Sequence, residues 1–146
     1  MNNYQNLDLN TVKEKVAEYA SIEEARHFIM DETTDFNPLQ IRKNLKQTKE
    51  AMKLLKEDVF VSFDGIFNVN DLLEKAEKGF VLNGIELKNI LVFHNHCVRI
   101  VSVFNKIQED LSIKDYPDSI NLLPSVFDKI ERCIDNSGNV KDDASD

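Results

Sequence analysis

The stretch NPLQIRKNLKQTKEAMKLLKE, Asn37 to Glu57, decides the fold class because it carries the clearest helical period in the chain. Its inward positions alternate steps of four and three residues, which is the spacing of a coiled-coil-like seam. These positions are Ile41, Leu45, Thr48, Met52 and Leu55. Asn37 is a suitable N-cap, and Pro38 at the first helical position loses no hydrogen bond there. The pattern predicts a helix that ends at Glu57-Asp58.

Two shorter helices are predicted before this stretch. Asn10 has the residue type and position of an N-cap for the first of them. Ser21 and Glu24 have the spacing of a capping box, which predicts the start of the second. Thr33 to Phe36 is predicted to connect the second helix to the third.

Three more helices are predicted after it, separated by an extended piece at Val59 to Phe63 and a loop at 112–121. A fourth helix opens at Asn68 to Asp71 and closes at Gly79, where a left-handed cap is favoured. Asn83 to Glu86 caps a fifth, apolar helix that is predicted to run to Leu111, about 28 residues and about 42 Å. The last helix carries Val126, Phe127, Ile130 and Ile134.

The fold prediction is therefore all-α: an irregular bundle of about six helices around one long central helix. Residues 1–135 are predicted to form a single helical domain. Residues 136–146 are predicted to be a polar tail that frays unless something follows it.

Composition restricts the function classes. The 146 residues include 26 acidic and 18 basic side chains, for a net charge of −8. Because affinity for nucleic acids comes mostly from neutralised phosphates, an acidic chain disfavours strong stand-alone binding. There is no signal-peptide pattern, and the apolar run at 90–104 is interrupted by polar residues. The two cysteines form no CxxC pair, and nothing suggests secretion. We therefore expect a cytoplasmic protein with reduced thiols and no membrane partner.

Candidate catalytic and metal-binding groups are few. In the cluster at 94–97, His94 and Cys97 share a helix face, but His96 points roughly 200° away from His94. Structural zinc usually takes four ligands, so a polar break in a buried helix is favoured over a metal site. Cys133 is interpreted as a packing residue. Neither cysteine has a triad-like context, so we expect no catalytic residue. No phosphate-binding glycine loop occurs, so we expect no cofactor site and no ATP binding in this chain.

A basic strip on the third helix is the one candidate for nucleic-acid contact. Its residues are Arg42, Lys43, Lys46, Lys49 and Lys53, continued by Lys56. Glu50 and Glu57 lie beside them, so a solvated helix face is the favoured interpretation.

Two stretches carry a resemblance to a known family: LLEKAEKGFVLNGIEL at Leu72 to Leu87 and IERCIDNSGNVKDDAS at Ile130 to Ser145. Weaker matches in the same order are Leu7-x-Leu9, Glu18 to Ser21, Thr48, Glu50-Ala51, Leu54-Leu55 and Gly65-Ile66. Together they resemble the N-terminal region of the second bacterial MutS paralogue family. Members of that family are MutS-like ATPases that commonly end in a small MutS-related nuclease domain.

The resemblance implies a core and lever segment that joins DNA-proximal parts to an ATPase, with a long lever helix following the tail. It implies that the full-length relatives use ATP and magnesium. It also implies that they bind branched DNA and suppress recombination, or that they act on stalled ribosomes. The expected partner of this chain is then the remainder of a longer chain, with weak self-association through any apolar surface left uncovered. The alternative is a stand-alone helical adaptor that binds protein partners through the apolar helix.

Overall fold

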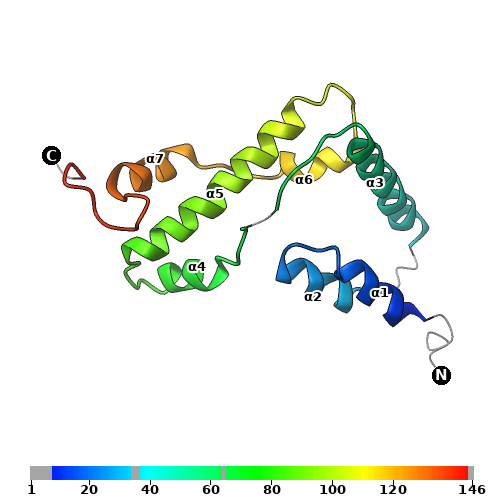
Figure 1. The fold of residues 1–146 in the computed structure, drawn as a ribbon, viewed down its shortest axis with the longest axis horizontal. Coiled ribbons are helices and arrows are strands. Elements are labelled where there is room, and N and C mark those ends of the chain that lie inside the picture. The colour runs from blue at the N-terminus through cyan, green and yellow to red at the C-terminus, as the bar shows by residue number, and fades with distance from the viewer. Residues whose placement is uncertain (1–7, 34–36, 64, 145–146) are drawn as a thin grey trace.

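The computed structural model describes residues 8–33, 37–63 and 65–144. Across these ranges the fold is all-α, as predicted, with no β-strand and one isolated bridge between Ile134 and Val140. The helices are α1 (Leu9–Ala17), α2 (Glu23–Asp31), α3 (Pro38–Lys56), α4 (Asn70–Glu77), α5 (Gly84–Asn105), α6 (Asp115–Asp118) and α7 (Pro124–Cys133), with a 3₁₀ turn, η2, at Ser112–Lys114 (Figure 1). The predicted connection at 34–36, Leu7 and the chain end at 145–146 lie outside the described residues.

The two strongest helix starts are confirmed. The Asn37 side chain accepts a hydrogen bond from the Leu39 amide at 3.0 Å, with Pro38 in the first turn. Asn83 and Glu86 form a complete capping box, in which the Glu86 amide donates to Asn83 and the Asn83 amide donates to the Glu86 carboxylate. Gly79 closes α4 in the left-handed conformation, with a φ of 81°.

Two upstream caps were predicted wrongly. Asn10 lies inside α1, because Asp8 takes up the left-handed N-cap conformation and the helix begins at Leu9. The Ser21 capping box is absent, because Ile22 holds the N-cap position of α2. The third helical residue is then Ala25, which has no carboxylate to return to the cap.

The long helix is shorter than predicted, and the loop after it is partly helical. α5 ends at Asn105 after 22 residues, about 33 Å. The chain then reverses, buries Leu111, and forms η2 and α6 within the predicted loop at 112–121. Pro117 is tolerated in α6 because amides of a first helical turn have no helical acceptor to lose.

The chain after α7 forms a turn. Ile134 and Val140 make the isolated bridge, and the Lys141 amide donates to the Cys133 carbonyl at 2.8 Å. The Asp135 carboxylate accepts from the amides of Ser137 at 2.7 Å and Asn139 at 2.8 Å. Residues 136–141, which were predicted to fray, therefore hold a hydrogen-bonded turn; the division into a domain and a tail stays a prediction.

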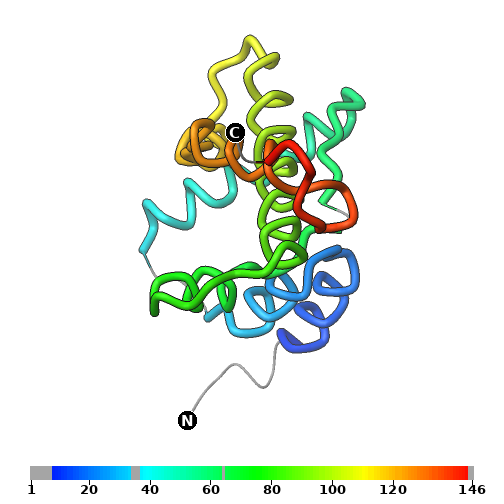
Figure 2. The backbone as a smooth tube through the Cα atoms, turned by 90° about the vertical axis from the view of Figure 1, so that its left-hand side faces the viewer, coloured from blue at the N-terminus to red at the C-terminus, as the bar shows by residue number. Residues whose placement is uncertain are grey.

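The helices are arranged openly around α5. α7 and α6 pack on α5, while α1 and α2 pair with each other and lie at one edge of the molecule (Figures 1 and 2). The buried apolar residues are Ala17, Leu54, Val69, Ile90, Leu111 and Ile134, and no described side chain is less than 2% exposed. Many large apolar side chains are instead more than half exposed, among them Tyr19, Leu39 and Val81. The fold therefore leaves much apolar surface uncovered. No helix of the described ranges is both long and apolar enough to cross a membrane.

Candidate functional site

Helix α3 is held in place by a polar face. Gln47 and Glu50 are only 6% and 9% exposed, although both are polar. Gln47 donates to the Ser112 carbonyl at 3.1 Å and accepts from the Tyr116 hydroxyl at 3.1 Å. The Glu50 carboxylate accepts from the Ser112 hydroxyl at 2.8 Å and from the Ile113 amide at 2.9 Å. Sequence reasoning missed this contact because such side chains are usually exposed.

The charge on Glu50 is part of the contact. Burial by itself would raise the pKa of this carboxyl, but the hydrogen bonds from Ser112 and Ile113 and the nearby Lys46 lower it. The pKa of Glu50 therefore lies below its usual value, and the group is an acceptor at neutral pH. The η2 turn is thus tied to α3 by a charge-assisted network.

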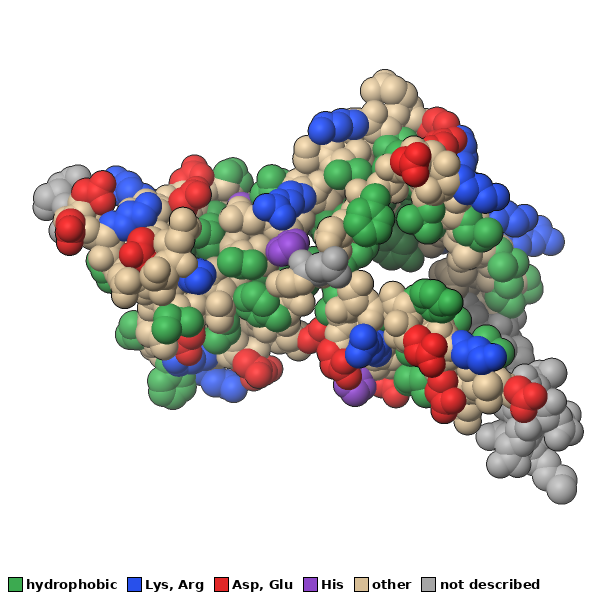
Figure 3. Space-filling view, viewed as in Figure 1, with side chains coloured by type: hydrophobic (Ala, Val, Ile, Leu, Met, Phe, Trp, Pro, Cys, Tyr) green, Lys and Arg blue, Asp and Glu red, His purple; other side chains and the backbone are tan. Residues whose placement is uncertain are grey.

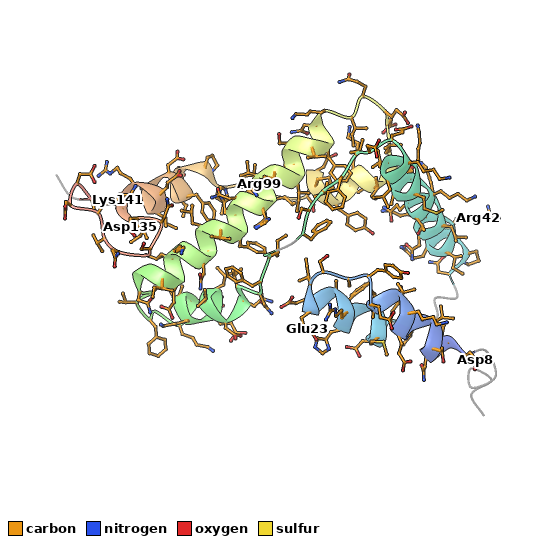
Figure 4. The ribbon with its side chains drawn as sticks, viewed as in Figure 1. Asp8, Glu23, Arg42, Arg99, Asp135 and Lys141 are labelled. Carbon is orange, nitrogen blue, oxygen red and sulfur yellow. The ribbon has the colours of Figure 1, made fainter. Side chains whose placement is uncertain are left out.

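The predicted basic strip separates into two groups. Lys43 pairs with Asp115 at 3.0 Å, Lys46 pairs with Glu50 at 3.6 Å, and Lys53 pairs with Glu57 and Glu109. The hydrogen bond that Lys53 donates to Glu109, with the charges of Glu109 and Glu57, raises the pKa of Lys53 above its usual value despite some burial. Arg42, Lys49 and Lys56 make no ion pair within the ranges that the structure describes. Figure 4 shows Arg42 pointing outward from α3.

The seam that identified α3 faces away from this contact. Leu45, Met52 and Leu55 are 57%, 53% and 60% exposed, whereas Leu54 is 6% exposed. At roughly 100° per residue, the seam lies on nearly the opposite side of the helix from Gln47, Glu50 and Leu54. In Figure 3, hydrophobic side chains gather around a hollow between α3 and the α1–α2 hairpin. The periodicity therefore predicted the helix correctly, but no helix of the described residues packs along its apolar face.

A pocket of about 460 Å³ opens beside the seam. One wall comes from α2, through Phe28 and Glu32. The others come from α3, η2 and α6, through Gln40, Asn44, Gln47, Thr48, Ala51, Ile113 and Tyr116. Its wall mixes amide, hydroxyl, carboxylate and apolar groups.

The histidine cluster on α5 serves the junction with α7. His94 hydrogen-bonds through Nε2 to the Leu122 carbonyl at 2.7 Å and stacks on Phe127, with ring centroids 3.6 Å apart and planes 9° apart. Its Nδ1 is buried without a hydrogen-bond partner among the described groups. Burial raises the pKa of the Cys97 thiol, which disfavours the nucleophilic thiolate. In the described part of the chain, no three His, Cys, Asp or Glu side chains are grouped to hold a metal ion.

The structure brings the start of α5, from the stretch at 72–87, against the turn around Gly138, from the second stretch. A Cβ atom at Gly84 would lie 2.0 Å from the Gly138 carbonyl oxygen, and one at Gly138 would lie 3.0 Å from the Ile85 backbone. Gly138 also has a φ of 84°, which favours glycine. The turn after α7, marked by Asp135 and Lys141 in Figure 4, therefore packs closely on the start of α5. Nearby, Lys75 of α4 pairs with Glu86 at 2.7 Å and, with the Asn83 amide, lowers the pKa of that carboxyl.

Comparison with known proteins finds similarity to proteins called Endonuclease MutS2. The relative from Clostridium botulinum (strain Eklund 17B / Type B) is 26% identical over 142 residues, which cover 95% of this chain and 18% of the relative. Those from Clostridium perfringens (strain 13 / Type A) and Geobacillus thermodenitrificans (strain NG80-2) are 24% and 27% identical, and each match covers 96% of this chain and 18% of the relative.

No family model matches the chain, and no solved structure matches it. The chain spans about a fifth of the length of the curated relatives it matches. These similarities support a MutS2-related helical segment, with the match extending over nearly all of its residues.

Proposed function

We propose that this chain is a structural and coupling segment of a MutS2-type ATPase that acts on branched DNA or on stalled ribosomes. The observation that carries the proposal is the similarity to Endonuclease MutS2 over 95% of the chain. The uncovered apolar surface supports it, because surfaces of this kind mark interaction sites. Apolar surface outside the seam of α3 would then be covered by other parts of the same ATPase.

In this proposal the residues of the chain supply a frame rather than chemistry. α5 is the longest helix of the described residues. His94 holds α7 against it, and the close approach of Gly84 and Gly138 holds the turn after α7. The Gln47 and Glu50 contacts connect α3 to the same frame. ATP and magnesium would bind elsewhere in the full-length protein, because this sequence has no phosphate-binding loop.

Any direct nucleic-acid contact by this chain would come from part of the predicted strip. Lys43, Lys46 and Lys53 are already neutralised by acidic partners. Arg42, Lys49 and Lys56 remain available, which is too few cations for tight binding by a chain of net charge −8. Such contact is therefore proposed as auxiliary to the full-length protein.

The alternative is a stand-alone adaptor that binds protein partners through an apolar helix. α5 was the expected binding helix, but most of its apolar residues are half-buried against its neighbours. The exposed seam of α3 is the feature that favours this alternative.

The native size of the protein separates the two functions. An antibody raised against residues 1–146 should detect, in the source cells, a polypeptide several times larger than 16.8 kDa. That polypeptide should hydrolyse ATP after immunopurification. A sole species of 16.8 kDa, with no ATPase in the purified fraction, would overturn the MutS2-type function and leave the adaptor.

A further inference from the structure

We propose that the exposed seam of α3 binds an amphipathic helix of another polypeptide whose flanking side chains are acidic. The α3 seam consists of Ile41, Leu45, Thr48, Met52 and Leu55, all exposed. Steps of four and three residues keep side chains in one line along the helix, which is the arrangement by which helices of a coiled coil pack together. α3 attaches to the rest of this chain through a different face, so the line is not used within the described structure.

The charge next to the α3 seam defines the occupant. Arg42, Lys49 and Lys56 follow one another at intervals of seven residues, so they form a row along one edge of the seam. These are the three cations of the strip that make no ion pair within the described ranges, whereas Lys43, Lys46 and Lys53 do. In helix pairs, this edge position commonly pairs with charges of opposite sign on the partner. Glutamate or aspartate on the incoming helix would complete the row.

The other edge of the α3 seam carries no charge and borders a pocket. Asn44 and Ala51 occupy it, again seven residues apart, and both line the pocket of about 460 Å³. Glu32 of α2 lies across that pocket. A helix with acids toward Arg42 and Lys49 and with apolar or neutral side chains toward Asn44 and Ala51 therefore fits both edges.

A second copy of this chain fits the surface poorly. In an antiparallel pair, the rows of Arg42, Lys49 and Lys56 from the two copies would face each other and repel. In a parallel pair, each row would face Asn44 and Ala51, which supply no negative charge. Nucleic acid would satisfy the cations but would leave the apolar seam uncovered. An acidic amphipathic helix satisfies both features at once.

The test uses the 146-residue chain and two fluorescent peptides of about three heptads, with Ile and Leu in the seam and with either Glu or Lys at the flanking positions. Anisotropy at low salt should show binding of the Glu peptide only. The combined substitution Arg42→Gln, Lys49→Gln and Lys56→Gln should weaken that binding about five- to tenfold. Leu45→Asp with Met52→Asp should remove it.

The matched control removes the same charge from the other group. Lys43→Gln, Lys46→Gln and Lys53→Gln together should change the affinity by less than about twofold, because these cations already have partners. Circular dichroism checks that each variant keeps its helix content. Equal binding of both peptides, equal effects of the two triple variants, or no binding of either peptide would overturn the proposal.

Two further outcomes would assign the surface to a different occupant and so also overturn it. One is dimerisation of the chain, seen by sedimentation, that Leu45→Asp abolishes. The other is duplex DNA binding that the Arg42, Lys49 and Lys56 variant removes but the Leu45 and Met52 variant does not. The inference does not depend on the MutS2-type function, and neither result changes the expected native size.

Discussion

Gly84→Ala should destabilise this chain, although alanine normally favours a helix. Gly84 is the first residue of α5, where alanine in place of glycine would gain up to about 1 kcal/mol. Here the new Cβ would lie 2.0 Å from the Gly138 carbonyl oxygen, well inside van der Waals contact. The neighbouring atom is backbone, so the turn at 135–141 must move as a unit. Overpacking of this kind costs about 1–3 kcal/mol, which lowers the melting temperature by about 3–10 °C.

The control for this prediction removes the neighbour instead of the glycine. In a chain shortened to end at Asp135, the same substitution should be neutral or stabilising, because the Gly138 carbonyl is gone. Thermal unfolding of the four proteins gives a double-mutant cycle whose coupling should be about 1–3 kcal/mol. Gly84→Ala that raises the melting temperature of the full chain would refute the close packing of α5 and the turn.

Three other predictions concern α3 and the absent phosphate loop. Leu54→Ala should lower the free energy of unfolding by about 2–5 kcal/mol, and Leu55→Ala by less than about 1 kcal/mol, in urea titrations; equal effects would contradict the orientation of α3. Because the pKa of Glu50 is lowered in the folded state, its charge contributes stability above about pH 4.5, and this stability is lost as the pH falls through the folded-state pKa. Glu50→Gln should therefore be most destabilising near neutral pH. A loss of unfolding free energy that stays constant down to about pH 3 would speak against it. Calorimetry of the isolated chain should show no saturable ATP binding, and micromolar affinity would contradict this.

Local signals in the sequence predicted the helices well where the cap chemistry was unambiguous. Asn37-Pro38 and the Asn83 to Glu86 box begin helices as expected, since each supplies its own acceptor for a free amide. Ser21 failed because the backbone of Ile22 took the N-cap position, which a residue-type pattern cannot resolve. α5 was predicted too long because the apolar run continues past its end: the buried Leu111 belongs to the reversal that follows.

The candidate site was harder to predict, because its key contacts join distant segments. Gln47 and Glu50 look like ordinary surface residues in the sequence. They become buried because the chain after α5 folds back onto α3, where Gln47 donates to the Ser112 carbonyl and Glu50 accepts from the Ile113 amide. The same fold-back pairs Lys43 with Asp115, so the basic strip contains both paired and unpaired cations. Periodicity located the seam residues correctly, but a period does not say whether a partner helix is present.

Carbene footprinting of the monomeric chain tests the central claim, that α3 attaches through its polar face and leaves its seam open. Labelling read by mass spectrometry should be strong at Met52 and Leu55 and weak at Leu54, in line with their 53%, 60% and 6% exposure. Adding the Glu-flanked peptide should then protect Met52 and Leu55 without changing Leu54. Protection of Met52 and Leu55 in the monomer, together with labelling of Leu54, would mean that α3 packs through its seam and would contradict the account.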